Sequence, residues 1–172
     1  FGTQLSPING AAAGVHSPFL YLSFMFSLER LYGRTLDDVG PTRGSGMPSD
    51  RQGPITALLP IVKFIVASVD AGDTGTSSIL VYENSWAELV RAPETGVRIK
   101  SLAYQVVPDK VHKIWAGMGG DLVTLPYPGK TFNPYHDGSM TFQHEGHWIT
   151  AWMAQGMVDL PKFFNELKIF SE

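Results

Sequence analysis

The amino-acid sequence predicts an α+β protein in which a long, curved and mostly antiparallel sheet packs on helices within a single domain, residues 1–172. An apolar run over residues 18–32 follows a Ser-Pro helix start and ends at Gly33, so it predicts a buried helix. Residues 95–107 are rich in β-branched residues and predict a long strand. Residues 158–170 combine an N-cap, a proline in the first turn and an apolar stripe, which predicts a final helix.

Two segments near the N-terminus lack a hydrophobic period. Residues 1–16 are small and turn-rich, which predicts an N-terminal arm. Residues 34–54 hold four glycines and three prolines and predict a flexible loop or lid, in which Arg43 and Arg51 would contact an anion. The segment is no phosphate-binding loop, because it lacks the Gly-Lys-Ser/Thr ending and no clear strand precedes it.

The middle of the chain allows two interpretations. Residues 55–75 contain either a strand, from the β-branched density after Ile61, or a helix with Pro60 in its first turn. The segments that follow are shorter and clearer. Residues 77–84 predict a short strand, and residues 85–92 predict one or two helical turns.

Residues 108–121 also allow two interpretations. Either their apolar residues at helical spacing form a helix, or Pro108-Asp109 is a hairpin turn followed by a return strand. Residues 121–129 predict a short strand, and residues 139–154 predict a further hairpin around a four-residue turn. The sequence shows no internal repeat.

Composition limits the classes of function. With 44% hydrophobic and 17% charged residues the chain is apolar for a soluble protein, which favours surface shared in a homodimer or an apolar cavity. The net charge of −3 and the lack of a basic run indicate no nucleic-acid and no membrane partner. The absence of cysteine excludes disulfides and thiolate nucleophiles. The apolar run 19–28 is too short to span a bilayer, so a soluble chain, cytoplasmic by default, is expected.

Three of the five histidines lie close to two carboxylates in the sequence: His136, Asp137, His144, Glu145 and His147. Positions three apart on a strand face opposite sides, so His144 and His147 can meet only across a turn. Their spacing matches no standard zinc pattern, and we predict neither a metal nor a cofactor. The remaining interpretations are a polar hairpin turn and acid–base catalysis in which Asp137 or Glu145 orients a histidine.

His112 is a further candidate base, because it lies in an otherwise apolar stretch. On a strand its side chain would face away from Lys113 and Trp115. Histidine titrates near neutrality, and Tyr104 on the neighbouring strand would complete a pair of base and phenol. The alternative is an ordinary core or surface histidine.

A set of large apolar side chains would form the wall of a pocket for a flat substrate. Trp148 and Trp152 share a face on a strand, and Met140 and Phe142 lie on the strand predicted to pair with it. Trp115 completes the set. The alternative is ordinary core packing.

The C-terminal third resembles a known family. In residues 140–170 a strand, a Glu-Gly turn, a Trp-rich return strand and an Asp-Leu-x-x-Phe-Phe-x-x-Leu motif are similar to the end of the NTF2-like superfamily, in particular the SnoaL-like polyketide cyclases. Residues 97–117 would be the preceding hairpin, and residues 62–73 resemble the family's helix. Residues 1–55 have no counterpart in the family.

The resemblance implies a cone-like half-barrel with an apolar pocket, where family members carry out cofactor-free chemistry or only bind ligands. The predicted function is a small cofactor-free lyase, isomerase or cyclase that acts on an apolar or aromatic natural-product-like molecule. The alternative is a non-catalytic small-molecule-binding protein or an interaction subunit of a larger complex. The predicted catalytic residues are His112, His147, His144, Asp137 and Tyr104; the predicted substrate-binding residues are Trp115, Trp148, Trp152, Phe142 and Met140.

Overall fold

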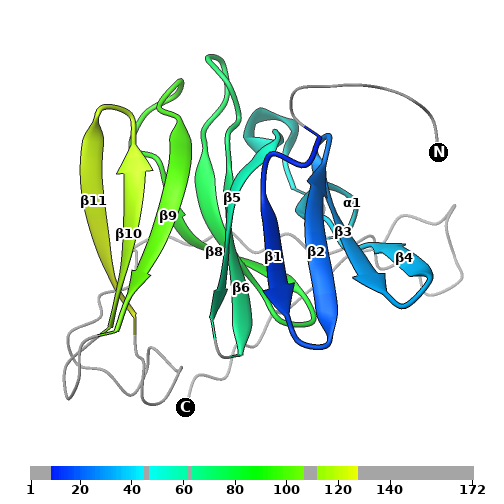
Figure 1. Cartoon of the computed structure of the whole chain (residues 1–172). Coiled ribbons are helices and arrows are strands. Elements are labelled where there is room, and N and C mark those ends of the chain that lie inside the picture. The colour runs from blue at the N-terminus through cyan, green and yellow to red at the C-terminus, as the bar shows by residue number, and fades with distance from the viewer. Residues whose placement is uncertain (1–8, 45–46, 62, 107–111, 128–172) are drawn as a thin grey trace, which may run out of the picture. The chain divides into compact units, whose positions relative to one another are not determined.

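The described part of the chain folds into eleven strands in three antiparallel sheets (Figure 1). All of it belongs to the first of two compact units, residues 1–142, and the second unit, residues 143–172, lies outside the described residues. The computed structural model describes residues 9–44, 47–61, 63–106 and 112–127.

Each sheet is an up-and-down meander of strands that follow one another in the chain, in the orders β1-β2-β3-β4, β5-β6-β7-β8 and β11-β10-β9. The first sheet consists of β1 (Ala13–His16), β2 (Phe19–Phe24), β3 (Ser27–Tyr32) and β4 (Thr35–Asp38). The middle sheet consists of β5 (Ile55–Ile61), β6 (Phe64–Val69), β7 (Ser78–Tyr82) and β8 (Trp86–Arg91). The third sheet consists of β9 (Ile99–Gln105), β10 (His112–Met118) and β11 (Asp121–Tyr127).

The predicted α+β class, with a half-barrel packed on helices, is wrong. The helices of the described residues are the four-residue α1 (Pro41–Gly44) and the three-residue 3-10 helix η1 (Ser49–Arg51), and neither covers a sheet. The sheets pack on one another instead, so the repeating unit is an antiparallel meander, with four strands in the first and middle sheets and three described strands in the third. This repeat lies in the topology and leaves no trace as a sequence repeat.

The predicted helix over residues 18–32 is the hairpin β2–β3. Its turn contains Met25, a non-glycine residue with a positive φ of 52°. The sequence appeared apolar on all sides because both faces of these strands carry apolar side chains, for example Tyr21 on one and Leu22 on the other. Without a polar face, the two-residue period of a strand is hidden.

Residues 85–92, predicted as helical turns, form β8 instead, because pairing with β7 overrides the helix propensity of Ala, Glu and Leu. The strand interpretation of residues 55–75 is confirmed, as the two strands β5 and β6. The predicted strands at β7, β9 and β11 are confirmed, and so is the return strand β10. The predicted arm contains β1, and the predicted lid contains β4, α1 and η1.

The middle sheet is buried on both faces. Ile65, Ala67 and Val69 lie in one apolar cluster with Tyr21 and Leu28 of the first sheet. A second cluster joins the opposite face to the third sheet; its buried members include Val66, Ile79, Ile99, Ile114 and Ala116. The core of the described unit therefore consists of two interfaces between sheets.

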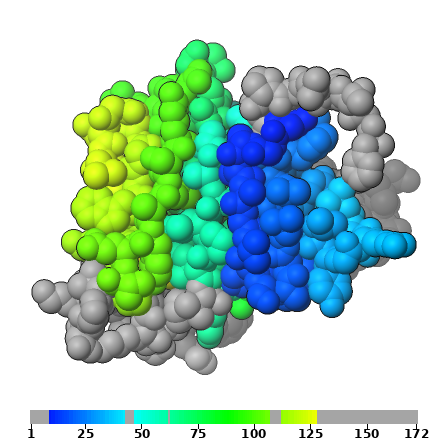
Figure 2. Space-filling model, in the orientation of Figure 1, coloured from blue at the N-terminus to red at the C-terminus, as the bar shows by residue number. Residues whose placement is uncertain are grey.

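The first strands of the three sheets lie next to one another: β1 contacts β5, and β5 contacts β9 (Figure 2). Each contact includes a hydrogen bond from a side chain to a main-chain carbonyl. His16 Nε2 donates to the carbonyl of Ile61 over 3.1 Å, and Thr56 Oγ1 donates to the carbonyl of Ile99 over 2.6 Å. Gly14 gives β1 room, since a Cβ there would lie 2.9 Å from Cγ of Pro60.

Candidate functional site

The structure brings together two of the predicted catalytic residues, Tyr104 and His112. Tyr104 lies near the end of β9 and His112 begins β10, so the β9–β10 pairing sets them on the same face of the third sheet. The Tyr104 hydroxyl and His112 Nδ1 share a hydrogen bond. Tyr127, the partner of His112 on β11, completes the cluster with its ring centroid 6.5 Å from that of Tyr104.

Burial sets the electrostatics of this cluster. It raises the pKa of Tyr127 to about 12, with smaller contributions in the same direction from Tyr104 and Glu83. Burial also raises the pKa of Tyr104. Both phenols therefore stay protonated across the physiological range. The pair of Tyr104 and His112 can hold or relay a proton: the phenol donates to Nδ1 in one tautomer of the imidazole, and Nδ1–H donates to the phenolic oxygen in the other.

Trp115 lies on the opposite face of the third sheet from His112, as strand alternation predicted. Its indole Nε1 donates a hydrogen bond of 2.9 Å to Oε1 of Gln105. Trp115 is therefore separated by the sheet from the pair of Tyr104 and His112 and does not form a common pocket with it. The other predicted site residues lie outside the described residues: Asp137, Met140, Phe142, His144, His147, Trp148 and Trp152.

A shallow pocket of about 140 Å³ lies at the edge between η1 and β8. Its lining is Met47, Pro48, Arg51, Leu80, Trp86, Ala87 and Glu88. Arg51 forms an ion pair with Glu88 over 3.2 Å, so this guanidinium already has an anionic partner. The indole Nε1 of Trp86 donates to the carbonyl of Val39 over 2.6 Å and ties β8 to the segment after β4.

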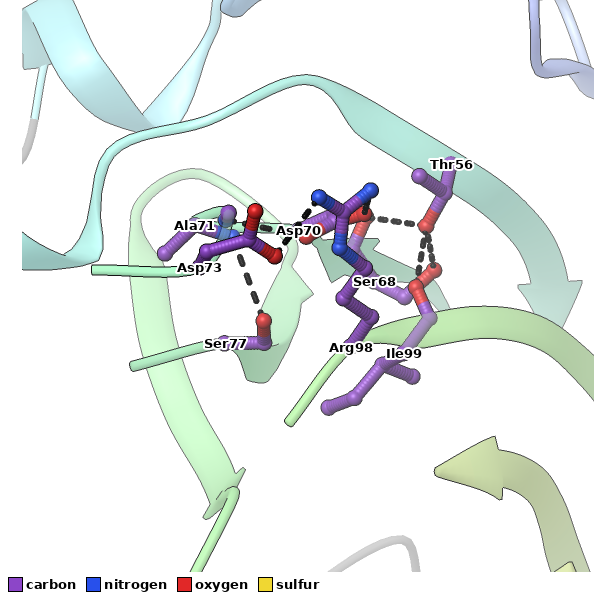
Figure 3. A network of polar contacts seen from close by, with 9 residues as sticks. Thr56, Ser68, Asp70, Ala71, Asp73, Ser77, Arg98 and Ile99 are labelled. Atoms are coloured by element: carbon purple, nitrogen blue, oxygen red, sulfur yellow. Dashed lines mark hydrogen bonds and ion pairs between the residues drawn. The ribbon is translucent and has the colours of Figure 1, made fainter. Parts of the chain in front are cut away.

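A polar network joins the ends of the middle and third sheets (Figure 3). Asp70 accepts a hydrogen bond from the main-chain N–H of Gly72 over 2.9 Å, and its other oxygen lies 3.8 Å from Arg98. Arg98 also pairs with Asp73 over 2.9 Å. Ser77 accepts from the N–H of Ala71 over 3.1 Å.

Sequence reasoning missed this network. The available signal was the stretch Asp70-Ala-Gly-Asp, a turn in which a short carboxylate bonds the main chain two residues on. Its partner Arg98 could not be predicted, because Arg98 is distant in the sequence and lies just before β9 of the third sheet. These contacts tie the turn after β6 to the segment before β9, so the network supports structure at this edge.

Within the described residues no group of three His, Asp or Glu side chains has the geometry to hold a metal ion. None of the helices found in the described residues has the length and hydrophobicity required to cross a membrane. Neither a known protein family, nor a curated protein, nor a solved structure matches this chain.

Proposed function

We propose that the chain is an assembly module of β-propeller type, which binds other protein surfaces through the open side of its first sheet. β-propellers repeat four-stranded antiparallel sheets radially about a channel. The support here is the repetition of consecutive meanders and the contact of their first strands, β1 with β5 and β5 with β9. Modules of this kind serve as rigid platforms whose exposed faces and loops bind partners.

The observation that carries the proposal is an apolar row on the side of the first sheet that faces away from the middle sheet. Val15, Leu20, Leu31 and Leu36 are direct cross-strand partners, so they form one row over all four strands. Val15 is 68% exposed and Leu36 is 48% exposed. A contiguous apolar patch of this kind on a soluble protein marks an interaction site.

The accessibility of this row in dilute protein tests the proposal. A soluble paramagnetic probe should broaden the NMR signals of the methyl groups of Leu20, Leu31 and Leu36. The methyl signals of Leu28 and Leu80, which are buried in the cluster between the first and middle sheets, are the internal control and should stay sharp. If Leu31 and Leu36 are as protected as Leu28, the row belongs to a closed core and the proposed function fails.

A second candidate function is cofactor-free acid–base catalysis, which the hydrogen bond between Tyr104 and His112 favours. In this proposal Nδ1–H of His112 donates to the phenolic oxygen of Tyr104, and Nε2 takes a proton from the carbon next to the carbonyl group of a small carbonyl compound. The electron pair of that C–H bond moves onto the carbonyl oxygen, and the O–H of Tyr104 stabilises the resulting oxyanion. Screening such compounds by NMR tests it, with the ring signals of both residues as the readout. A shift that disappears in Tyr104→Phe supports catalysis, and a screen that moves neither ring signal removes this candidate.

A further inference from the structure

In the middle and third sheets, the side that faces the preceding sheet is covered by that sheet. The first sheet has no preceding sheet in the chain, and its corresponding side has no described partner. The middle sheet turns Ile65 and Ala67 toward the sheet before it, where Tyr21 and Leu28 cover them. The third sheet turns Ile114 toward the middle sheet in the same way. The corresponding side of the first sheet carries the row from Val15 to Leu36, and no described element packs over it.

The side of the third sheet that faces away from the middle sheet is the other end of this stack of sheets. Two cross-strand rows lie on it, Ala103-Trp115-Thr124 and Ser101-Gly117-Leu122. Small residues flank Trp115, and Leu122 is 68% exposed. Such a surface can receive the aliphatic row of the first sheet. The charges are of opposite sign, since the same side of the third sheet carries Lys113 and that of the first sheet carries Glu29 and Asp38.

We infer that the open side of the first sheet binds the third sheet of a second copy of this chain, so that two copies close into one ring. The inference rests on the proposed function and names its partner. A head-to-tail contact of this kind uses two different surfaces, and it closes when the rotation between copies returns to the start. Two copies of three sheets supply six, which lies within the range of about four to eight sheets in known propellers.

Interface area favours the ring over a contact between two first sheets. Four strands about 4.8 Å apart and about five residues long cover about 300 Å² per side. One such contact between two copies covers about 600 Å², which is the size of a crystal contact, whereas the two contacts of a closed ring reach about 1,200 Å². A stable complex therefore needs both contacts.

Engineered disulfides test the inference cleanly, because the chain contains no cysteine. Val15→Cys places a thiol on β1 of the first sheet, and Ala103→Cys places one on β9 of the third. Mixing the two single variants of the full chain under mild oxidation should give a covalent heterodimer. Each variant alone should stay uncrosslinked. Glu94→Cys, in the exposed turn between β8 and β9, replaces Ala103→Cys in the matched control and should not react with Val15→Cys.

Light scattering of the unmodified chain provides the second readout and should show a dimer whose fraction rises with concentration. Leu31→Lys should raise the dimer dissociation constant by at least about tenfold, while Glu94→Lys should leave it unchanged. The fold of each variant is checked by its circular dichroism spectrum and melting temperature.

Three outcomes would overturn the inference. Crosslinking of Val15→Cys with itself would show a symmetric contact of two first sheets. A ladder of higher oligomers from the Val15→Cys, Ala103→Cys double variant would show an open filament. A monomer at every concentration would exclude the second copy, but with Leu20 and Leu31 still accessible to the paramagnetic probe the proposed function would stand.

Discussion

The middle sheet and the first sheet share one topology but differ in how many of their faces are covered. In β6 of the middle sheet every residue from Ile65 to Val69 is buried. In β2 of the first sheet buried residues alternate with half-buried ones, so Tyr21 is buried while Leu20 is not. The same meander is thus a core element in one place and a surface element in the other. The two sheets differ in the number of sheets that pack against them. This number should determine how much a substitution lowers the free energy of unfolding.

The largest effect is expected from truncating a side chain in the middle sheet. Ile79 is fully buried against the third sheet, so Ile79→Ala should lower the free energy of unfolding by about 2–5 kcal/mol. Leu36→Ala, on the open side of the first sheet, should change it by less than about 1 kcal/mol. Urea unfolding at low micromolar concentration measures both. Equal losses would mean that the open side of the first sheet is covered in the dilute protein.

The same contrast explains which strands could be predicted from the sequence. Residues 95–107 were recognised as a strand, and β9 shows the alternation of exposed and half-buried residues that a strand with one covered face produces. The hairpin β2–β3 was predicted as a helix because apolar side chains on both faces conceal the period of two. Residues 85–92 were predicted as helical turns because Ala87, Glu88 and Leu89 favour a helix. These residues form the strand β8 because they pair with β7, which the local sequence does not show.

The candidate site was predictable to the extent that it is local. Tyr104 and His112 are neighbours because their strands β9 and β10 pair in antiparallel fashion, and one of the two interpretations of the sequence contained this pairing. The predicted turn itself, Pro108-Asp109, lies outside the described residues. The ion pair of Arg51 with Glu88 and the contact of Asp70 with Arg98 link distant segments. Their formation depends on how one sheet packs on the next, and no local periodicity encodes that packing.

The pH dependence of the free energy of unfolding should show how well the interface between the middle and third sheets excludes water. Tyr127 is buried there, and its pKa in the folded protein is about 12 against 10.0 for a free phenol. Because the folded pKa is raised, the stabilisation is complete below pH 10 and is lost as the pH rises toward 12. The loss is on the order of 2–3 kcal/mol.

Urea unfolding at several pH values between 9 and 12 measures this loss, and phenolate absorbance at 295 nm follows the ionisation itself. Tyr127→Phe should remove most of the dependence, whereas Tyr32→Phe, at an exposed phenol in the first sheet, should not. If Tyr127→Phe leaves the pH dependence of the free energy of unfolding unchanged, this phenol is open to water and the interface between the two sheets does not exclude water.

Substitution of Gly14, which lies where the first sheet contacts the middle sheet, should lower stability by an intermediate amount. In Gly14→Ala the new Cβ would lie 2.9 Å from Cγ of Pro60, a ring atom on the facing strand β5 that cannot rotate away. The strands β1 and β5 must separate, at a cost of about 1–2 kcal/mol. Gly120→Ala is the matched control, because nothing lies within 4 Å of its Cβ. A neutral Gly14→Ala in thermal unfolding would show that the first sheet can shift on the middle sheet.

The smallest effect is expected where the middle sheet meets solvent, at the carboxylates bound by Arg98. Asp73 pairs with Arg98 over 2.9 Å, but its side chain is 83% exposed, so solvent and salt screen the pair. Asp73→Ala should leave the melting temperature unchanged at 150 mM salt. Asp70→Ala should lower stability by about 1 kcal/mol, because its buried carboxylate accepts from the N–H of Gly72 and holds the turn after β6. Since both carboxylates pair with the same guanidinium, a difference between the two variants measures what the burial of Asp70 and its hydrogen bond to Gly72 add to the ion pair. A melting temperature that falls equally in both variants would instead assign the stabilisation to the charge of Arg98.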